Sequence, residues 1–209
     1  MKNLFIVFDG MDGSGKSTQL SLLHDYLFGK DKSIRILSTR EPTYGKYGRQ
    51  IRQNLKTHKN PYTDADKLMD LFIKDRQDHI NGLIRPFMKK DFGNVSIVLC
   101  DRYYYSTIAY QHAQGIEISK LIKMNQKFLK PDLAIILDLH PETALRRISK
   151  ERSVEKFEKI EFMKELRKIF NPLPQVMDDN ITIIDTSGSE EETFAQIKRQ
   201  VDKLIRKKR

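Results

Sequence analysis

The sequence predicts an α/β fold: a doubly wound, five-stranded parallel sheet with helices on both faces. Five short apolar runs have the composition of strands that are covered on both faces, as the strands of parallel sheets are. Between them lie longer segments whose hydrophobic residues recur at helical spacing, and such an alternation is typical of this class. We find no linker, repeat or low-complexity tract, so we expect one domain over residues 1–209.

Strands and helices alternate along the whole chain. The expected strands are LFIVFD (4–9), IRILST (34–39), VSIVLCD (95–101), LAIILDL (133–139) and ITIIDT (181–186). The expected helices cover about 16–29, 48–56, 64–90, 105–128, 141–175 and 189–207.

Composition limits the ligands and the cellular compartment that we expect for this chain. The 38 Lys and Arg residues exceed the 28 Asp and Glu residues, and a net charge of +10 suits nucleic acid, an anionic surface or phosphorylated ligands. The basic tail KLIRKKR is explained by a solvated helix end. No apolar run approaches the roughly 20 residues of a membrane span, and no secretory signal opens the chain. The single cysteine, Cys100, excludes an intramolecular disulfide, and together these features predict a cytoplasmic protein.

The stretch FDGMDGSGKST (8–18) joins the first strand to the first helix. Gly10, Gly15, Lys16 and Ser17 match the pattern G-x-x-x-x-G-K-[ST], in the strand-to-helix setting that this motif requires. The glycines allow backbone N–H groups to surround an anion at the positive end of the helix. Lys16 is expected to reach the β- and γ-phosphates, and the Ser17 hydroxyl to bind Mg²⁺. The stretch is therefore predicted to be a P-loop that binds a nucleoside triphosphate.

GTP is disfavoured as the bound triphosphate because no N-K-x-D motif follows the fourth strand, where LDLHPE stands. The DTSG at 185–188 resembles a switch motif, but it follows the last strand, and we interpret it as a loop. The residues expected to contact ATP are Gly10, Met11, Asp12, Gly13, Ser14, Gly15, Lys16, Ser17 and Thr18.

Polar residues also follow the second and third strands. Arg40 stands in TREP, and Asp101 and Arg102 begin DRYYYSTIAYQ. Ligands of open α/β sheets bind outside the carboxyl ends of the strands, so these residues should share a rim with the P-loop. Two guanidinium forks there favour a second phosphate group, although a surface salt bridge would explain either one alone. We expect Asp101 to help Ser17 hold Mg²⁺, partly through water.

The longest helical segment places an arginine among apolar residues. Leu68, Phe72, Arg76 and Ile80 are four residues apart and therefore lie along one face. Phe72 and Arg76 could stack on a base and hydrogen-bond its carbonyls. The alternative is a core phenylalanine beside an arginine whose head reaches water.

A basic segment follows the fourth strand. It is either a solvated helix face or a lid that closes on the transferring phosphates, over about 146–159. Its basic residues are Arg146, Arg147, Lys150, Arg152, Lys156 and Lys159.

The motifs together resemble those of thymidylate kinases. GMDGSGKST, TREP, LFIKDRQ, DRYYYSTIAYQ and PDLAIILDL occur in the order seen in that family, from Met1 to about Arg206. The element after the third strand is the specific part, because a P-loop alone marks a superfamily. The resemblance implies transfer of the γ-phosphoryl of ATP to dTMP, giving dTDP and ADP for dTTP synthesis. It also implies a short lid and a homodimer.

Roles on the acceptor side follow from the matching positions. Arg40 and Arg102 match residues that hold the acceptor phosphate, and Phe72 and Arg76 match those that stack on and hydrogen-bond thymine. Thr107 matches a polar side chain that faces the thymine ring.

Four further roles follow from the resemblance. Tyr110 matches a tyrosine that crowds the sugar 2′ position, and Asp12 a carboxylate near the 3′-hydroxyl. Asp9 matches an acidic position near the Mg²⁺–phosphate network. Because Gly13 stands where some members carry a catalytic basic residue, the lid is expected to supply one, and its candidates are Arg152 and Lys156.

Two other functions stay open at this point. The nearest is another nucleoside monophosphate or deoxynucleoside kinase on the same scaffold. The second is a nucleotide-binding protein that associates with nucleic acid, but no nucleic-acid-binding motif is found. ATP and dTMP are thus the expected partners, with no nucleic acid and no membrane. The five histidines show no metal-ligand spacing.

Overall fold

The central sheet is parallel and has five strands in the order β2-β3-β1-β4-β5. A computed structural model describes residues 3–57, 60–89, 95–151 and 155–207. The strands are β1 Leu4–Asp9, β2 Arg35–Arg40, β3 Ser96–Asp101, β4 Leu133–Asp138 and β5 Ile181–Asp185. The predicted class and all five predicted strands are confirmed, with ends shifted by one residue at most.

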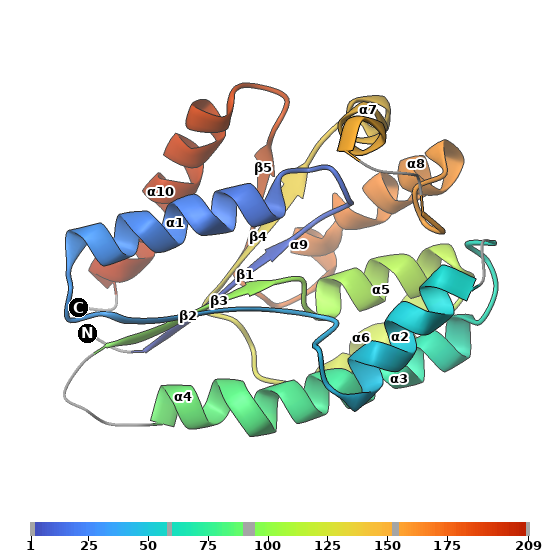
Figure 1. Ribbon diagram of the computed structural model, residues 1–209, viewed down its shortest axis with the longest axis horizontal. Helices are drawn as coiled ribbons and strands as arrows, with labels where there is room; N and C mark the ends of the chain where they lie inside the picture. The colour runs from blue at the N-terminus through green and yellow to red at the C-terminus, as the bar shows by residue number, and fades with distance from the viewer. Residues whose placement is uncertain (1–2, 58–59, 90–94, 152–154, 208–209) are drawn as a thin grey trace.

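Helices cover both faces of the sheet (Figure 1). The helices and the π-helical turn η1 are α1 Lys16–Lys30, α2 Lys46–Thr57, α3 Ala65–His79, η1 Ile80–Ile84, α4 Arg85–Lys89, α5 Tyr104–Ala113, α6 Ile118–Asn125, α7 Pro141–Glu151, α8 Ile160–Phe170, α9 Leu173–Val176 and α10 Glu190–Lys207.

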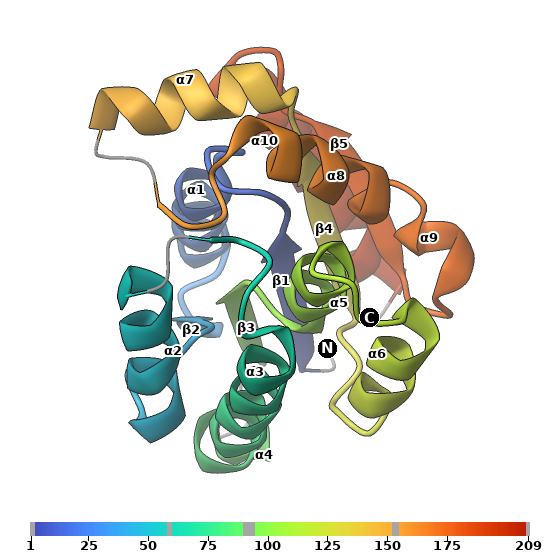
Figure 2. The ribbon, with the colours of Figure 1, turned by 90° about the vertical axis from the view of Figure 1, so that its right-hand side faces the viewer.

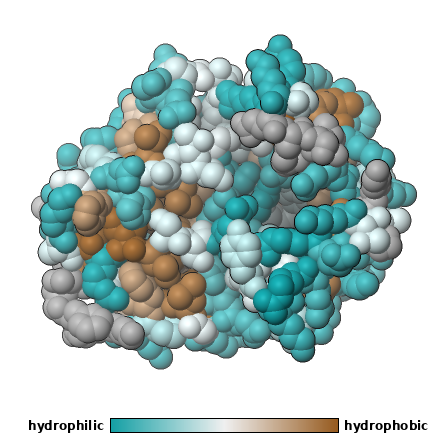
Figure 3. All heavy atoms as spheres, in the orientation of Figure 1, coloured by the Kyte–Doolittle hydropathy of each residue, from teal (hydrophilic) through white to brown (hydrophobic). Residues whose placement is uncertain are grey.

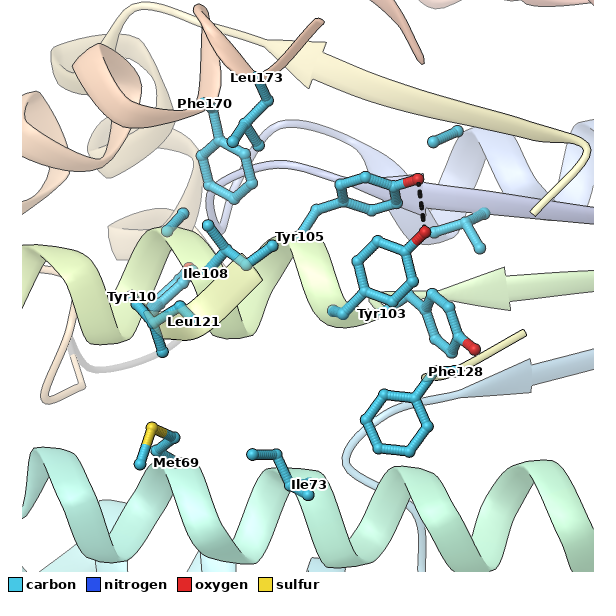
Figure 4. Packing of buried hydrophobic residues seen from close by; sticks show 14 of the residues in the cluster. Met69, Ile73, Tyr103, Tyr105, Ile108, Tyr110, Leu121, Phe128, Phe170 and Leu173 are labelled. Carbon is cyan, nitrogen blue, oxygen red and sulfur yellow. Dashed lines mark hydrogen bonds between the residues drawn. The ribbon is translucent and has the colours of Figure 1, made fainter. Parts of the chain in front are cut away.

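The alternation of side chains in β1 builds two separate cores. Leu4 and Ile6 lie in the cluster that includes α1 and α10, whereas Phe5 and Val7 lie in the cluster that includes α3, α5 and α8. Figure 4 shows part of the second core, where Met69 of α3 points toward α5. The whole of β1 is buried, which explains its continuous apolar sequence.

Two predicted helices prove to be several shorter ones. The segment 105–128 divides at Gly115, whose φ of 98° lies in the left-handed region that ends a helix. The segment 141–175 divides around non-helical residues before α8 and again near Pro172. By contrast, the predicted helix 64–90 is nearly one continuous rod over the described residues 65–89, because η1 joins α3 to α4.

The parallel register brings the polar residues predicted for the site to one end of the sheet. Phe8 pairs with Asp101, and Arg40 pairs with Asp101 from the other side. The strands therefore end at the same level, which faces the viewer in Figure 2. In Figure 3 polar side chains gather on this side of the molecule, while hydrophobic ones lie mostly at the other end. No helix in the described part of the chain is long and apolar enough to cross a membrane.

Asp202 joins α10 to α1. It accepts hydrogen bonds from Lys30 Nζ at 2.6 Å and from the Tyr26 hydroxyl at 2.9 Å. Partial burial acts to raise the pKa of Asp202, but Lys30, Lys198 and Tyr26 outweigh it and lower the pKa to about 2.

This depressed pKa predicts a pH-dependent contribution to stability. The pKa of this carboxyl in the unfolded chain is about 4. The stabilisation is therefore present above that pH and is lost as the pH falls toward 2. Asp202→Asn should lower the free energy of unfolding at pH 7 by about 1 kcal/mol or less, since partly exposed ion pairs contribute little. Urea denaturation at pH 7 and pH 3 measures this. A difference between variant and wild type that is as large at pH 3 would show that the charge is not responsible.

Candidate functional site

The P-loop has the backbone conformation that its glycines allow. Gly10 and Gly13 have φ values of 129° and 77°, in the region that side chains disfavour. A Cβ at Gly10 would lie 2.5 Å from the Leu137 carbonyl oxygen, and one at Gly13 would lie 2.6 Å from that of Ala144. Position 13 therefore has no room for a basic side chain. The loop lines a pocket of about 530 Å³.

Lys16 begins α1 and points back into the loop. Its Nζ donates to the Met11 carbonyl oxygen at 2.8 Å, and only 6% of the residue is exposed. Burial lowers the pKa of this ammonium, although Asp12, Asp101 and Asp9 act in the opposite direction. The cation is thus held at the phosphate site in a poorly solvated state, where an anionic ligand would be attracted strongly.

Ser17 and Asp101 meet beside the P-loop, as predicted. The Ser17 hydroxyl donates to Asp101 Oδ2 at 2.9 Å. Within the described residues, the buried Asp101 Oδ1 has no hydrogen-bond partner. An orphaned carboxylate oxygen next to a hydroxyl is a donor set that fits Mg²⁺, which prefers oxygen ligands and keeps several waters. The described residues contain no cluster of three or more His, Cys, Asp or Glu side chains that could hold a metal alone.

Asp9 lies under the P-loop rather than in a pocket. It is fully buried, and its carboxylate accepts hydrogen bonds from the backbone of Gly10, Tyr103 and Ser106. The Ser106 hydroxyl also donates to it, at 2.6 Å. Burial raises the pKa of Asp9, and Arg102 and these hydrogen bonds counteract that effect. In this structure Asp9 ties the P-loop to the start of α5.

Arg102 faces the P-loop from the end of β3. Its φ of 71° is strained for a residue other than glycine, and its N–H donates to the Phe8 carbonyl oxygen at 2.7 Å. Its guanidinium donates to Asp12 at 2.6 Å and lies over the Tyr110 ring. Burial acts to lower the pKa of Arg102, but Asp12 and nearby groups raise it well above its ordinary value. A permanently charged guanidinium therefore stands between the P-loop and the next pocket.

That next pocket has a volume of about 350 Å³ and contains most of the predicted acceptor residues. Its lining includes Asp12, Arg40, Phe72, Arg76, Arg102 and Tyr110. Arg40, which is exposed, also lines the P-loop pocket, so it stands where the two pockets meet.

Arg76 is completely buried at the end of this pocket. Its Nη1 donates to Asn125 Oδ1 at 2.8 Å, and its Nη2 donates to Thr107 Oγ1 at 2.9 Å. Nη2 also pairs with Glu41 Oε2 at 2.8 Å. Among the described residues, Arg76 Nε is left without a hydrogen-bond partner. The arginine is therefore a fixed, buried cation whose Nε is free to donate, and not one whose head reaches water.

Gln111 adds an unused acceptor to the same pocket. It is fully buried, its amide donates to Gln114 at 2.9 Å, and its Oε1 has no partner within the described part of the chain. Phe72 is half-buried and offers a flat apolar surface. Thr107 is 1% exposed, accepts a hydrogen bond from Arg76, and is not among the residues that line this pocket.

The structure does not bring Lys156 to the P-loop. Its Nζ donates to the Thr63 carbonyl oxygen at 3.1 Å and lies 4.0 Å from Asp64. Burial lowers the pKa of this lysine. Phe157, next to it, packs edge-on against Tyr110 with ring centroids 5.1 Å apart. Residues 155–157 thus cover the acceptor side, and Arg152, the other predicted cation, lies outside the described residues.

Two cations of α7, Arg147 and Lys150, line the P-loop pocket. Arg147 donates to the Gly13 carbonyl oxygen at 3.5 Å and to that of Thr186 at 3.2 Å. Thr186 belongs to the DTSG loop, so this loop also borders the P-loop pocket. Arg147 stands in the basic segment of the sequence, but no role was predicted for it. None was predicted for Glu41, Gln111 or Asn125 either, although the first two stand inside the motifs TREP and AYQ.

The fold and these pockets define the class of protein. A five-stranded parallel sheet with a P-loop after β1 and a second pocket beside it is the fold of P-loop nucleoside monophosphate kinases. A family model described as thymidylate kinase matches residues 8–197, and the chain belongs to that family.

Individual relatives agree with this assignment. The chain is 42% identical over 170 residues to a thymidylate kinase of Desulfotalea psychrophila, covering 80% of each chain. It is 35% identical over 216 residues to a thymidylate kinase of Caldicellulosiruptor saccharolyticus, covering 100% of each. It is 34% identical to a probable thymidylate kinase of Pyrococcus horikoshii, covering 94% of this chain and 95% of the relative.

Proposed function

We propose that this protein transfers the γ-phosphoryl group of ATP to dTMP, giving ADP and dTDP. The observation that carries the choice of base is the pair of unused groups in the acceptor pocket. Arg76 Nε can donate and Gln111 Oε1 can accept. Thymine offers a carbonyl oxygen at C4 and an N–H at N3 on one edge, whereas cytosine offers the reverse pattern. A thymine edge would satisfy both groups, and a cytosine edge neither.

Phosphoryl transfer in this site needs positioning and charge neutralisation more than covalent catalysis. An oxygen of the dTMP phosphate attacks the γ-phosphorus, and the bond from that phosphorus to the β–γ bridging oxygen breaks. The attacking phosphate is already ionised near neutral pH, because its second pKa is about 6. Arg40 and Arg102 are placed to orient it, since both border the acceptor pocket and the P-loop pocket. No strong general base is required.

Lys16, Arg147 and Lys150 line the P-loop pocket, and these cations would neutralise charge on the donor phosphates. Ser17 and Asp101 would hold Mg²⁺, which when bound neutralises charge on the β- and γ-oxygens. Residues 155–157 lie against the acceptor side, where they would exclude water from the transferring group.

A panel of acceptors tests the function. With saturating ATP and Mg²⁺, we expect ADP release that depends on dTMP, a weaker response to dUMP, and little response to AMP, CMP, dCMP or thymidine. A coupled ADP assay measures this. Absence of dTMP-dependent ADP release would refute the proposal, and a preference for another monophosphate would favour the alternative kinase on the same scaffold.

A further inference from the structure

His79, the last residue of α3, bridges two residues at the end of β2. Its Nε2 lies 2.8 Å from Thr39 Oγ1, and its Nδ1 lies 3.1 Å from Glu41 Oε1. Because a carboxylate only accepts, Nδ1 is the donor in the second contact. The histidine is 4% exposed, and the chain changes to the π-helical turn η1 directly after it. Such turns occur frequently at functional sites.

Arg40 stands between the two residues that His79 contacts. Thr39 and Glu41 flank Arg40 in the sequence, and the side chains of both contact the histidine. The imidazole thus holds the residues on both sides of the arginine that borders the acceptor and P-loop pockets. The direction of the Arg40 side chain depends on the backbone of these residues.

Glu41 links His79 to Arg76 at the other end of the acceptor pocket. While Oε1 faces the histidine, Oε2 pairs with Arg76 Nη2 at 2.8 Å. Glu41 and Arg76 are both buried, with exposures of 2% and 0%. In such a poorly solvated network each group orients its neighbours strongly. The orientation of the Arg76 guanidinium therefore depends on a carboxylate that His79 holds.

We propose that His79 is a positioning residue for the acceptor site, which aligns Arg40 at the phosphate end and Arg76 at the base end through its two ring nitrogens. The proposal rests on the proposed function, because it assumes that dTMP occupies this pocket. His79 itself does not contact the nucleotide. The His79 side chain therefore sets the distance and the angle between Arg40 and Arg76.

Two conservative substitutions separate the two contacts. In His79→Asn, the amide nitrogen can take the place of Nδ1 and still donate to Glu41, but the contact with Thr39 is lost. In His79→Gln, the longer side chain can reach Thr39 from the place of Nε2, but the contact with Glu41 is lost. Thr39→Val removes only the hydroxyl and should reproduce His79→Asn. His24, which lies on α1 beside Asp25, offers matched control variants His24→Asn and His24→Gln.

Calorimetric titration with thymidine, dTMP and ATP tests the proposal, because thymidine presents the base without the phosphate. For His79→Gln we expect the Kd of thymidine to rise about tenfold, the effect of one lost hydrogen bond. For His79→Asn and Thr39→Val we expect thymidine to bind within about twofold of wild type, while the Kd of dTMP rises about tenfold. The Kd of ATP should stay constant in all variants, and the His24 variants should match wild type throughout.

Two results would overturn this inference and leave the proposed function intact. One is wild-type affinity for thymidine and dTMP in all His79 and Thr39 variants. The other is an equal loss of affinity for thymidine, dTMP and ATP, which general loosening of the fold would produce. A wild-type protein that binds neither thymidine nor dTMP would instead refute the proposed function, and this inference with it.

Discussion

Lys16→Ala is expected to lower turnover by about 100- to 1000-fold, the usual cost of removing one preorganised donor to developing charge. Lys16 is held inside the P-loop by its contact with Met11, a position that the other cations lining this pocket do not occupy. Steady-state kinetics with dTMP and ATP–Mg²⁺ measure the loss, which should fall on kcat more than on the KM of dTMP. A variant with a kcat within about threefold of wild type would remove Lys16 from the catalytic groups.

The charge of Lys16 should lower the stability of the folded protein. Burial lowers the pKa of Lys16, which means that the folded state disfavours its charge relative to the unfolded chain. Lys16→Met keeps the length of the side chain without the charge. We therefore expect this variant, free of nucleotide, to unfold at the same temperature as wild type or a higher one, while its turnover falls like that of Lys16→Ala. A clearly lower unfolding temperature would show that the Lys16 charge stabilises the fold.

Local sequence patterns predicted the strands better than the helices. A strand that is buried on both faces has a continuous apolar composition, as LFIVFD of β1 does, and its ends are visible in the sequence. The breaks inside 105–128 and 141–175 depend on single residues, such as Gly115, whose backbone conformation helical spacing does not reveal. Helical periodicity continues across such breaks, so it predicts that helices exist but not where they end.

The site was predictable wherever its residues lie within one motif. Gly10, Lys16 and Ser17 have fixed relative positions because a strand, a tight loop and a helix follow directly. Asn125, by contrast, reaches Arg76 across 49 positions of sequence, and only the packing of α6 against the rest of the fold brings them together. Lys156 shows the converse, since its charge and its place within the predicted lid suggested a catalytic role, but its contact with Thr63 depends on tertiary structure.

Arg76→Met is expected to raise the Kd of dTMP by about 10- to 100-fold. Hydrogen bonds from charged donors contribute about 1.5–3 kcal/mol. The methionine keeps an apolar stem, but it loses the guanidinium that lies over the Tyr103 and Phe128 rings. The substitution also leaves the Glu41 carboxylate buried without its cation. We therefore expect a loss of about 3–5 kcal/mol in the free energy of unfolding, measured by urea denaturation without nucleotide.

The double variant Glu41→Gln with Arg76→Met separates recognition from folding. Glu41→Gln removes the buried charge, so the double variant should recover most of the lost free energy of unfolding. It should not recover affinity for dTMP, because the donor to the base is still missing, while the Kd of ATP should stay at the wild-type value. Calorimetric titration with both nucleotides distinguishes the possibilities. If the double variant bound dTMP as tightly as wild type, Arg76 would act only by neutralising Glu41, and a different group would have to recognise thymine.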